Sequence, residues 1–190
     1  MTTPGELFKE GDCLLVIDVQ NDFCPGGRLA IDDGDAVVPV MNRYIDAALK
    51  QNIPVYLSRD WHPAGHVSFA EAGGQWPPHC VQDTHGAKFH PDLKVPESAM
   101  VITKGVRFDK DQNSAFDETG LADKLKNDGI RRVVVGGLAL DVCVLATVQD
   151  ALSEGFSAVV SLSGTRPVTP EGGGAAIEKM KAAGAEVIPD

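Results

Sequence analysis

Apolar runs of strand length alternate along the chain with segments of helical periodicity. Residues 13–19 form an apolar run with one charged residue, Asp18, near its end, as is typical of a central strand buried on both faces. Five further runs predict strands, and they span residues 53–58, 99–103, 132–136, 157–162 and 186–188. This alternation favours parallel strands joined by crossover helices.

Helical spacing is clearest after the first predicted strand. The positions of one apolar stripe recur at intervals of three and four residues, and they are Val37, Val40, Met41, Tyr44 and Ala48. We expect Asp35 to cap this helix and Pro39 to lie in its first turn. Three more helices are predicted at 121–127, 141–153 and 171–183.

Together these elements predict an α/β fold. We expect an open, doubly wound, mainly parallel six-stranded sheet with helices on both faces, in one domain spanning residues 1–190. Residues 60–98, after the second strand, are rich in His, Pro, Gly and Trp and show little periodicity. Insertions of this length are usually functional.

Composition narrows the classes of function. The 17 basic and 27 acidic residues give a net charge of −10, and no Lys/Arg cluster indicates nucleic-acid binding. No stretch reaches the roughly 18 apolar residues of a membrane span, and the first ten residues lack a secretory pattern. We therefore expect a cytoplasmic protein that acts on a small molecule and binds neither nucleic acid nor membrane.

Reactive side chains fall at the carboxyl ends of the predicted strands. Asp18, Asp60 and Lys104 end the first three strands, and Cys143 follows the fourth at the start of a helix. Ligands of open α/β sheets bind beyond these ends, near the point where the strand order reverses. We therefore expect the four side chains to lie close together.

Three of these side chains predict nucleophilic catalysis. A thiol at a helix N-terminus beside an ammonium has a lowered pKa, so Cys143 beside Lys104 is the candidate nucleophile. Asp18 would accept the thiol proton and later donate it to a leaving group. Each residue also has a structural alternative: a turn or cap for Asp18, an exposed strand end for Lys104, and the core for Cys143. We expect Asp141 to be the N-cap of the following helix.

The insertion predicts a metal site. Three of the five histidines in the chain lie within eighteen residues here, close after Asp60. Imidazole and carboxylate groups bind divalent zinc, iron or manganese, with zinc the first choice. We choose Asp60, His62 and His79 as ligands, and His66 as either a fourth ligand or a supporting neighbour. The surface is the expected place of the other two histidines, His85 and His90.

Five sequence motifs follow one another along nearly the whole chain. They are LLVIDVQNDFCPGG (14–27), SRDWHPAGHVSF (58–69), WPPHCVQ (76–82), VITKG (101–105) and GLALDVCV (137–144). With these motifs the chain resembles the nicotinamidase/pyrazinamidase family of the isochorismatase-like cysteine hydrolases. The resemblance implies metal-dependent hydrolysis of nicotinamide, and of pyrazinamide, through a cysteine thioester, and a place in NAD salvage.

The resemblance also implies roles for individual residues. The implied residues are a triad of Asp18, Lys104 and Cys143, metal ligands Asp60, His62 and His79, oxyanion donors in the backbone of Ala139 and Cys143, and aromatic walls Phe23 and Trp76. A cis peptide between Leu138 and Ala139 is implied as well.

Three positions depart from the family pattern. Leu140 replaces a common threonine, Asn113 replaces a common tyrosine, and residues 163–167 replace an Asp-Ala-x-Arg-Gly segment. These departures bear on substrate breadth and turnover rather than on the class of reaction. Two alternatives stay open: a cysteine amidase for another small amide or carbamoyl substrate, and a non-catalytic ligand-binding relative. A homo-oligomer is compatible with the sequence.

Overall fold

A six-stranded parallel sheet forms the centre of the molecule. A computed structural model describes residues 3–189, so residues 1, 2 and 190 of the predicted domain lie outside the described residues. The strands are β1 (Asp12–Ile17), β2 (Val55–Asp60), β3 (Met100–Lys104), β4 (Arg132–Leu138), β5 (Ser157–Arg166) and β6 (Glu186–Ile188). Their order is β3-β2-β1-β4-β5-β6, which confirms the predicted doubly wound sheet.

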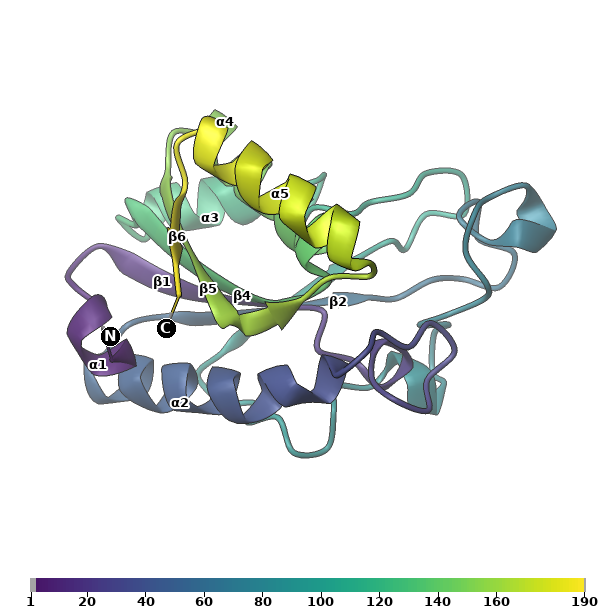
Figure 1. Ribbon diagram of the computed structural model, residues 1–190, viewed down its shortest axis with the longest axis horizontal. Coiled ribbons are helices and arrows are strands. Elements are labelled where there is room, and N and C mark those ends of the chain that lie inside the picture. The colour runs from purple at the N-terminus through teal and green to yellow at the C-terminus, as the bar shows by residue number, and fades with distance from the viewer. Residues whose placement is uncertain (1–2, 190) are drawn as a thin grey trace.

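Helices cover both faces of the sheet (Figure 1). The helices are α1 (Pro4–Leu7), α2 (Val37–Lys50), α3 (Leu121–Asn127), α4 (Leu145–Ser153) and α5 (Pro170–Ala182). Side chains of β1 alternate between two cores, with Leu14 and Val16 packed on the side of α2 and Leu15 and Ile17 on the side of α3, α4 and α5. No helix among the described residues is long and apolar enough to cross a membrane.

Helix α2 buries the predicted apolar stripe, and Pro39 lies in its first turn. The prediction that Asp35 caps this helix is wrong, because Asp35 lies inside a 3-10 turn, Gly34–Ala36. That turn runs directly into α2, and the backbone amide of Val37 donates to carbonyl oxygens of the turn. Backbone carbonyl groups, rather than a capping side chain, therefore accept the hydrogen bond of this first helical amide.

The insertion between β2 and β3 folds back against the end of β1. It contains two 3-10 turns, Ala70–Ala72 and His85–Ala87. The amide of His90 donates to Val19 O at 2.9 Å, and the amide of Asn21 donates to Lys88 O at 2.9 Å. The irregular insertion is thereby attached to the carboxyl edge of the sheet. Both His85 and His90 were predicted to lie at the surface. His85 is exposed and His90 is half-buried.

Gly137 of β4 pairs with Ile17 of β1 and leaves no room for a side chain. This residue has a φ of 115°, which side chains rarely adopt, and an added Cβ would collide with the carbonyl oxygen of Ile17. We expect Gly137→Ala to lower the free energy of unfolding by about 3 kcal/mol or more, measured by urea denaturation. Gly174→Ala in α5 is the control, because a Cβ there meets nothing within 4 Å. Equal stability of the two variants would contradict this expectation.

Candidate active site

Lys104 is the buried centre of the charged groups at the sheet edge. Its Nζ lies 2.8 Å from Asp18 Oδ2 and 2.6 Å from Asp60 Oδ1, and it donates to Gln112 O at 3.3 Å. Cys143 Sγ lies 3.6 Å from the same nitrogen. Lys104 Nζ therefore donates to Asp60 Oδ1, Gln112 O and Cys143 Sγ and forms an ion pair with Asp18, so it acts on the sulfur both as a charge and as a hydrogen-bond donor.

The charge of Lys104 is maintained by its neighbours. Burial alone would lower the pKa of Lys104, but the carboxylates of Asp18 and Asp60 raise this pKa well above its ordinary value. Burial would likewise raise the pKa of Asp60, yet Lys104 and then His62 hold it below its usual range. Lys104 is therefore an ammonium and Asp60 a carboxylate.

Cys143 lies in a π-helical turn, Leu140–Val144, which precedes α4. The expectation that its thiol has a lowered pKa is wrong: burial raises the pKa of Cys143 well above its ordinary value, although Lys104 acts in the opposite direction. Desolvation of the thiolate outweighs one ammonium when two carboxylates are also near. The resting thiol is thus protonated, and its reaction requires a base.

Asp18 is in position to be that base. Its side chain is fully buried, and burial raises the pKa of Asp18 even though Lys104 opposes the shift. Ser58 Oγ donates to Asp18 Oδ1 at 2.7 Å and fixes the orientation of the carboxylate. Asp18 also has a left-handed backbone, with a φ of 47°. Sequence reasoning missed Ser58, although strand alternation places it on the same face of β2 as Asp60.

Asp60, His62 and His79 each offer one ligand atom, and these atoms lie within 4.8 Å of one another. His62 Nδ1 lies 2.9 Å from Gly105 O, and His79 Nδ1 lies 2.8 Å from Pro77 O. In the neutral tautomer whose Nδ1 donates to these carbonyls, Nε2 is unprotonated and can bind a cation. His62 Nε2 is buried without a hydrogen-bond partner among the described residues. The three side chains therefore fit a divalent cation.

Gln20 holds the backbone of Asp60 in place. The side-chain oxygen of Gln20 accepts from the Asp60 amide, and its nitrogen donates to Asp60 O and to Ala87 O, each at 2.8 Å. Gln20 is fully buried. It was not predicted, although its position two residues after Asp18 was a usable signal.

His66 lies behind His62 and does not join the same ligand set as Asp60. Its ring stacks on His62 with the centroids 4.1 Å apart. Its Nδ1 lies 2.7 Å from Ser68 Oγ and its Nε2 lies 3.1 Å from Lys110 O, so both nitrogens have partners. Ligand atoms of His66, His62 and Asp111 also gather within 4.8 Å. The occupied nitrogens nevertheless favour a supporting position for His66.

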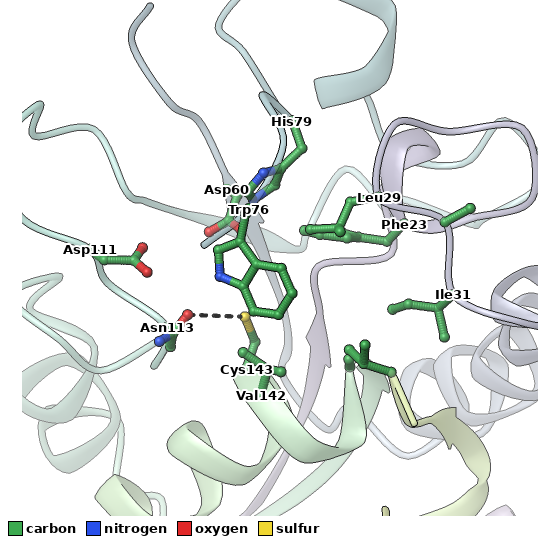
Figure 2. Close-up of a pocket in the computed structure, with 13 residues that line it drawn as sticks. Phe23, Leu29, Ile31, Asp60, Trp76, His79, Asp111, Asn113, Val142 and Cys143 are labelled. Atoms are coloured by element: carbon green, nitrogen blue, oxygen red, sulfur yellow. Dashed lines mark hydrogen bonds between the residues drawn. The ribbon is translucent and has the colours of Figure 1, made fainter. Parts of the chain in front are cut away.

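A cavity opens above the sulfur of Cys143 (Figure 2). Phe23 and Trp76 line it, as do Ala139 and Cys143. The remaining lining is apolar on one side, with Leu29, Ala30, Ile31, Val142 and Val168, and polar on the other, with Asp60, His79, Asp111 and Asn113. The cavity lining thus includes Cys143 of the predicted triad, two predicted ligands and both predicted wall residues. Asp18, Lys104 and His62 are not part of the lining and lie buried behind Cys143 and Asp60.

The chain is similar to known proteins over most of its length. A family model described as the isochorismatase domain matches residues 12–189. The nicotinamidase of Escherichia coli K12 is 41% identical over 195 residues, covering 90% of this chain and 92% of that protein. The nicotinamidase/pyrazinamidase of Mycobacterium tuberculosis is 35% identical, with 92% and 97% covered. The chain belongs to the nicotinamidase/pyrazinamidase family of isochorismatase-like hydrolases.

Solved structures support this assignment of the chain as an amidohydrolase. The structure of the Pyrococcus horikoshii pyrazinamidase in complex with zinc superposes with a TM-score of 0.91 at 40% identity. The superposition covers 94% of this chain and 98% of that chain. The nicotinamidase/pyrazinamidase fold therefore extends over nearly the full length of both chains.

In this nicotinamidase/pyrazinamidase family member, the turn that contains Cys143 differs from the sequence prediction. Asp141 is not an N-cap, because the helix opens with a π-helical turn whose N-cap residue is Ala139. The Asp141 carboxylate instead accepts from the amides of Val168 at 2.8 Å and Thr169 at 3.4 Å, which connects the turn to the start of α5. The implied cis peptide between Leu138 and Ala139 is present.

Proposed function

We propose that the chain hydrolyses nicotinamide to nicotinate and ammonia, and pyrazinamide by the same route. The observation that carries the proposal is the position of Cys143 Sγ at an aromatic-lined cavity, 3.6 Å from Lys104 Nζ and beside a buried carboxylate. The similarity of the chain to the E. coli nicotinamidase and to the M. tuberculosis nicotinamidase/pyrazinamidase supports this choice of substrates.

Acylation begins with transfer of the thiol proton to Asp18. The sulfur of Cys143 attacks the carboxamide carbon, and the S–C bond forms while the carbonyl oxygen gains negative charge. The backbone amides of Ala139 and Cys143 stabilise this oxygen, and one such donor is commonly worth about 10² to 10³ in rate. Asp18 then returns the proton to the nitrogen, the C–N bond breaks and ammonia leaves a thioester.

Deacylation uses the same base. Asp18 accepts a proton from a water molecule, whose oxygen attacks the thioester carbon. The S–C bond breaks, the proton on Asp18 returns to the sulfur of Cys143, and the product leaves as nicotinic acid, which ionises to nicotinate. Lys104 keeps its charge throughout and stabilises the Asp18 carboxylate and the transient thiolate.

Asp60, His62 and His79 would hold one divalent ion, for which two imidazoles and a carboxylate make zinc the best choice. When bound, the ion would supply a Lewis-acid contact for the ring nitrogen of the substrate. The rings of Phe23 and Trp76 would orient the substrate ring above Cys143.

Ammonia release by zinc-loaded protein tests the proposal. We expect nicotinamide and pyrazinamide to be hydrolysed with higher kcat/KM than a carbamoyl substrate such as an N-carbamoyl amino acid. The reverse preference would indicate the related carbamoyl amidase. Tight nicotinamide binding without ammonia release would indicate a non-catalytic ligand-binding protein.

The charge of Lys104 should be visible in the alkylation of Cys143. Because the ammonium favours the thiolate, Lys104→Met should raise the pH at which iodoacetamide modifies Cys143. Modification is measured by mass spectrometry of the Cys143 peptide, after circular dichroism has confirmed the fold. Lys94→Met is the control, because Lys94 is an exposed partner of Asp46. An unchanged alkylation profile in Lys104→Met would refute the charge partnership.

A further inference from the structure

We infer that Asn113 selects primary carboxamides by accepting a hydrogen bond from the –NH₂ group of the substrate. The inference rests on the proposed function and adds to it a residue that recognises the leaving nitrogen. A carboxamide is planar, with its oxygen and nitrogen on different sides of the carbon. When the oxygen faces the backbone amides of Ala139 and Cys143, the nitrogen must face another part of the cavity.

Asn113 lies where that nitrogen needs an acceptor. Its Oδ1 is 4.0 Å from Cys143 Sγ, and Figure 2 shows this oxygen directed toward the sulfur. The Cys143 thiol is its one hydrogen-bond partner within residues 3–189. Asn113 is exposed and lines the cavity. The oxygen is thus available to a molecule bound above the nucleophile.

The backbone on both sides of Asn113 is held firmly. The buried side chain of Gln112 accepts from the Gly105 amide at 2.9 Å. On the other side, the amide of Ala115 donates to Thr147 Oγ1 at 3.0 Å. These bonds attach the segment to the end of β3 and to α4, so Asn113 keeps its place beside the nucleophile.

The rest of the lining offers few alternative acceptors. The side chains on its apolar side have no hydrogen-bond acceptor. Asp60 and His79 belong to the candidate metal cluster. Asp111 Oδ1 accepts from the amide of Gln112 at 3.0 Å, and the Asp111 carboxylate gathers with His62 and His66 rather than with Cys143. An amide N–H that enters a cavity without an acceptor loses its bond to water, which disfavours binding. Asn113 Oδ1 is therefore the acceptor that the geometry assigns to the carboxamide nitrogen.

Replacing the amide nitrogen of the substrate separates this contact from general packing. Methyl nicotinate keeps the ring and the carbonyl group but has no N–H on its leaving atom. With zinc-loaded protein, Asn113→Leu should lower kcat/KM for nicotinamide about three- to tenfold, as expected for one neutral hydrogen bond. The same variant should change kcat/KM for methyl nicotinate by less than about twofold. Inhibition by nicotinaldehyde, which also lacks the nitrogen, should be unchanged.

Two further variants complete the test. Asn113→Asp keeps acceptor oxygens, so its ratio of amide to ester hydrolysis should stay within about twofold of the unsubstituted protein, although the added charge slows both reactions. Val168→Ala is the control for cavity shape, because Val168 lines the same cavity with an apolar side chain. Val168→Ala should change kcat/KM for nicotinamide and for methyl nicotinate by the same factor.

The outcomes distinguish this inference from the proposed function. Equal losses for amide and ester in Asn113→Leu would overturn the inference and assign the residue to packing. No loss for either substrate would overturn it too. If the unsubstituted protein hydrolyses the ester but not nicotinamide, the proposed function itself fails, and the inference fails with it.

Discussion

Cys143→Ala should reduce ammonia release from nicotinamide by at least about 10⁴-fold, because no other group in the cavity can form the thioester. Nicotinamide binding should stay within about tenfold of the unsubstituted protein. The aromatic walls and the candidate metal cluster contact the ring without needing the sulfur. Turnover is measured as ammonia released by zinc-loaded protein, and binding by calorimetry.

The control for this variant is another buried thiol. Cys13 lies in β1, away from the cavity lining, so Cys13→Ala should leave kcat unchanged. Acid quenching during turnover should trap a nicotinoyl adduct on the unsubstituted protein and on Cys13→Ala. Cys143→Ala should yield no adduct. Residual turnover comparable to that of the unsubstituted protein would rule out Cys143 as the nucleophile.

Removing the metal should abolish most of the advantage of nicotinamide over benzamide. The two amides are similar in size, but only nicotinamide has a ring nitrogen that a cation on Asp60, His62 and His79 can bind. Because this contact would orient the carboxamide over Cys143, its loss should lower kcat/KM for nicotinamide and leave benzamide slow throughout. The measurement is kcat/KM for both amides in zinc-loaded and chelated protein, after the fold has been checked by circular dichroism.

Variants of two histidines locate this effect. His79→Ala should reproduce chelation, with loss of stoichiometric zinc binding. His66→Ala should be milder, weakening zinc affinity about tenfold, because both His66 nitrogens already have protein partners and its ring supports His62. A chelated protein that still prefers nicotinamide by the original factor would show that the cluster does not anchor the ring.

The strands were predictable where apolar residues fill them, and less so where they do not. The pattern ends the fifth strand at residue 162, but β5 continues to Arg166. Its last part is polar, yet Thr165 and Arg166 pair with Gly137 and Leu138 of β4. Pairing with a neighbouring strand extends this element beyond the apolar pattern, and a single sequence does not reveal that pairing.

The convergence of the site followed from topology, whereas its electrostatics did not. Asp18, Lys104 and Cys143 could be placed together because parallel strands share one carboxyl edge. The direction of the thiol pKa depended on how completely the protein excludes water around Cys143, and spacing along the chain carries no measure of that. In the sequence, Asn113 is only a departure from the family pattern, because its role depends on its distance from the sulfur, which the sequence does not give.

The left-handed backbone of Asp18 determines which replacement can isolate its chemistry. Its φ of 47° is accompanied by a tight bond from the Gln20 amide to Asp18 O at 2.8 Å. Asparagine occupies this region of backbone conformation several-fold more readily than most residues, whereas alanine does so at a cost. With Asp18→Ala, loss of the base could therefore not be separated from displacement of the strand end. Asp18→Asn removes the proton acceptor and keeps the path of the backbone.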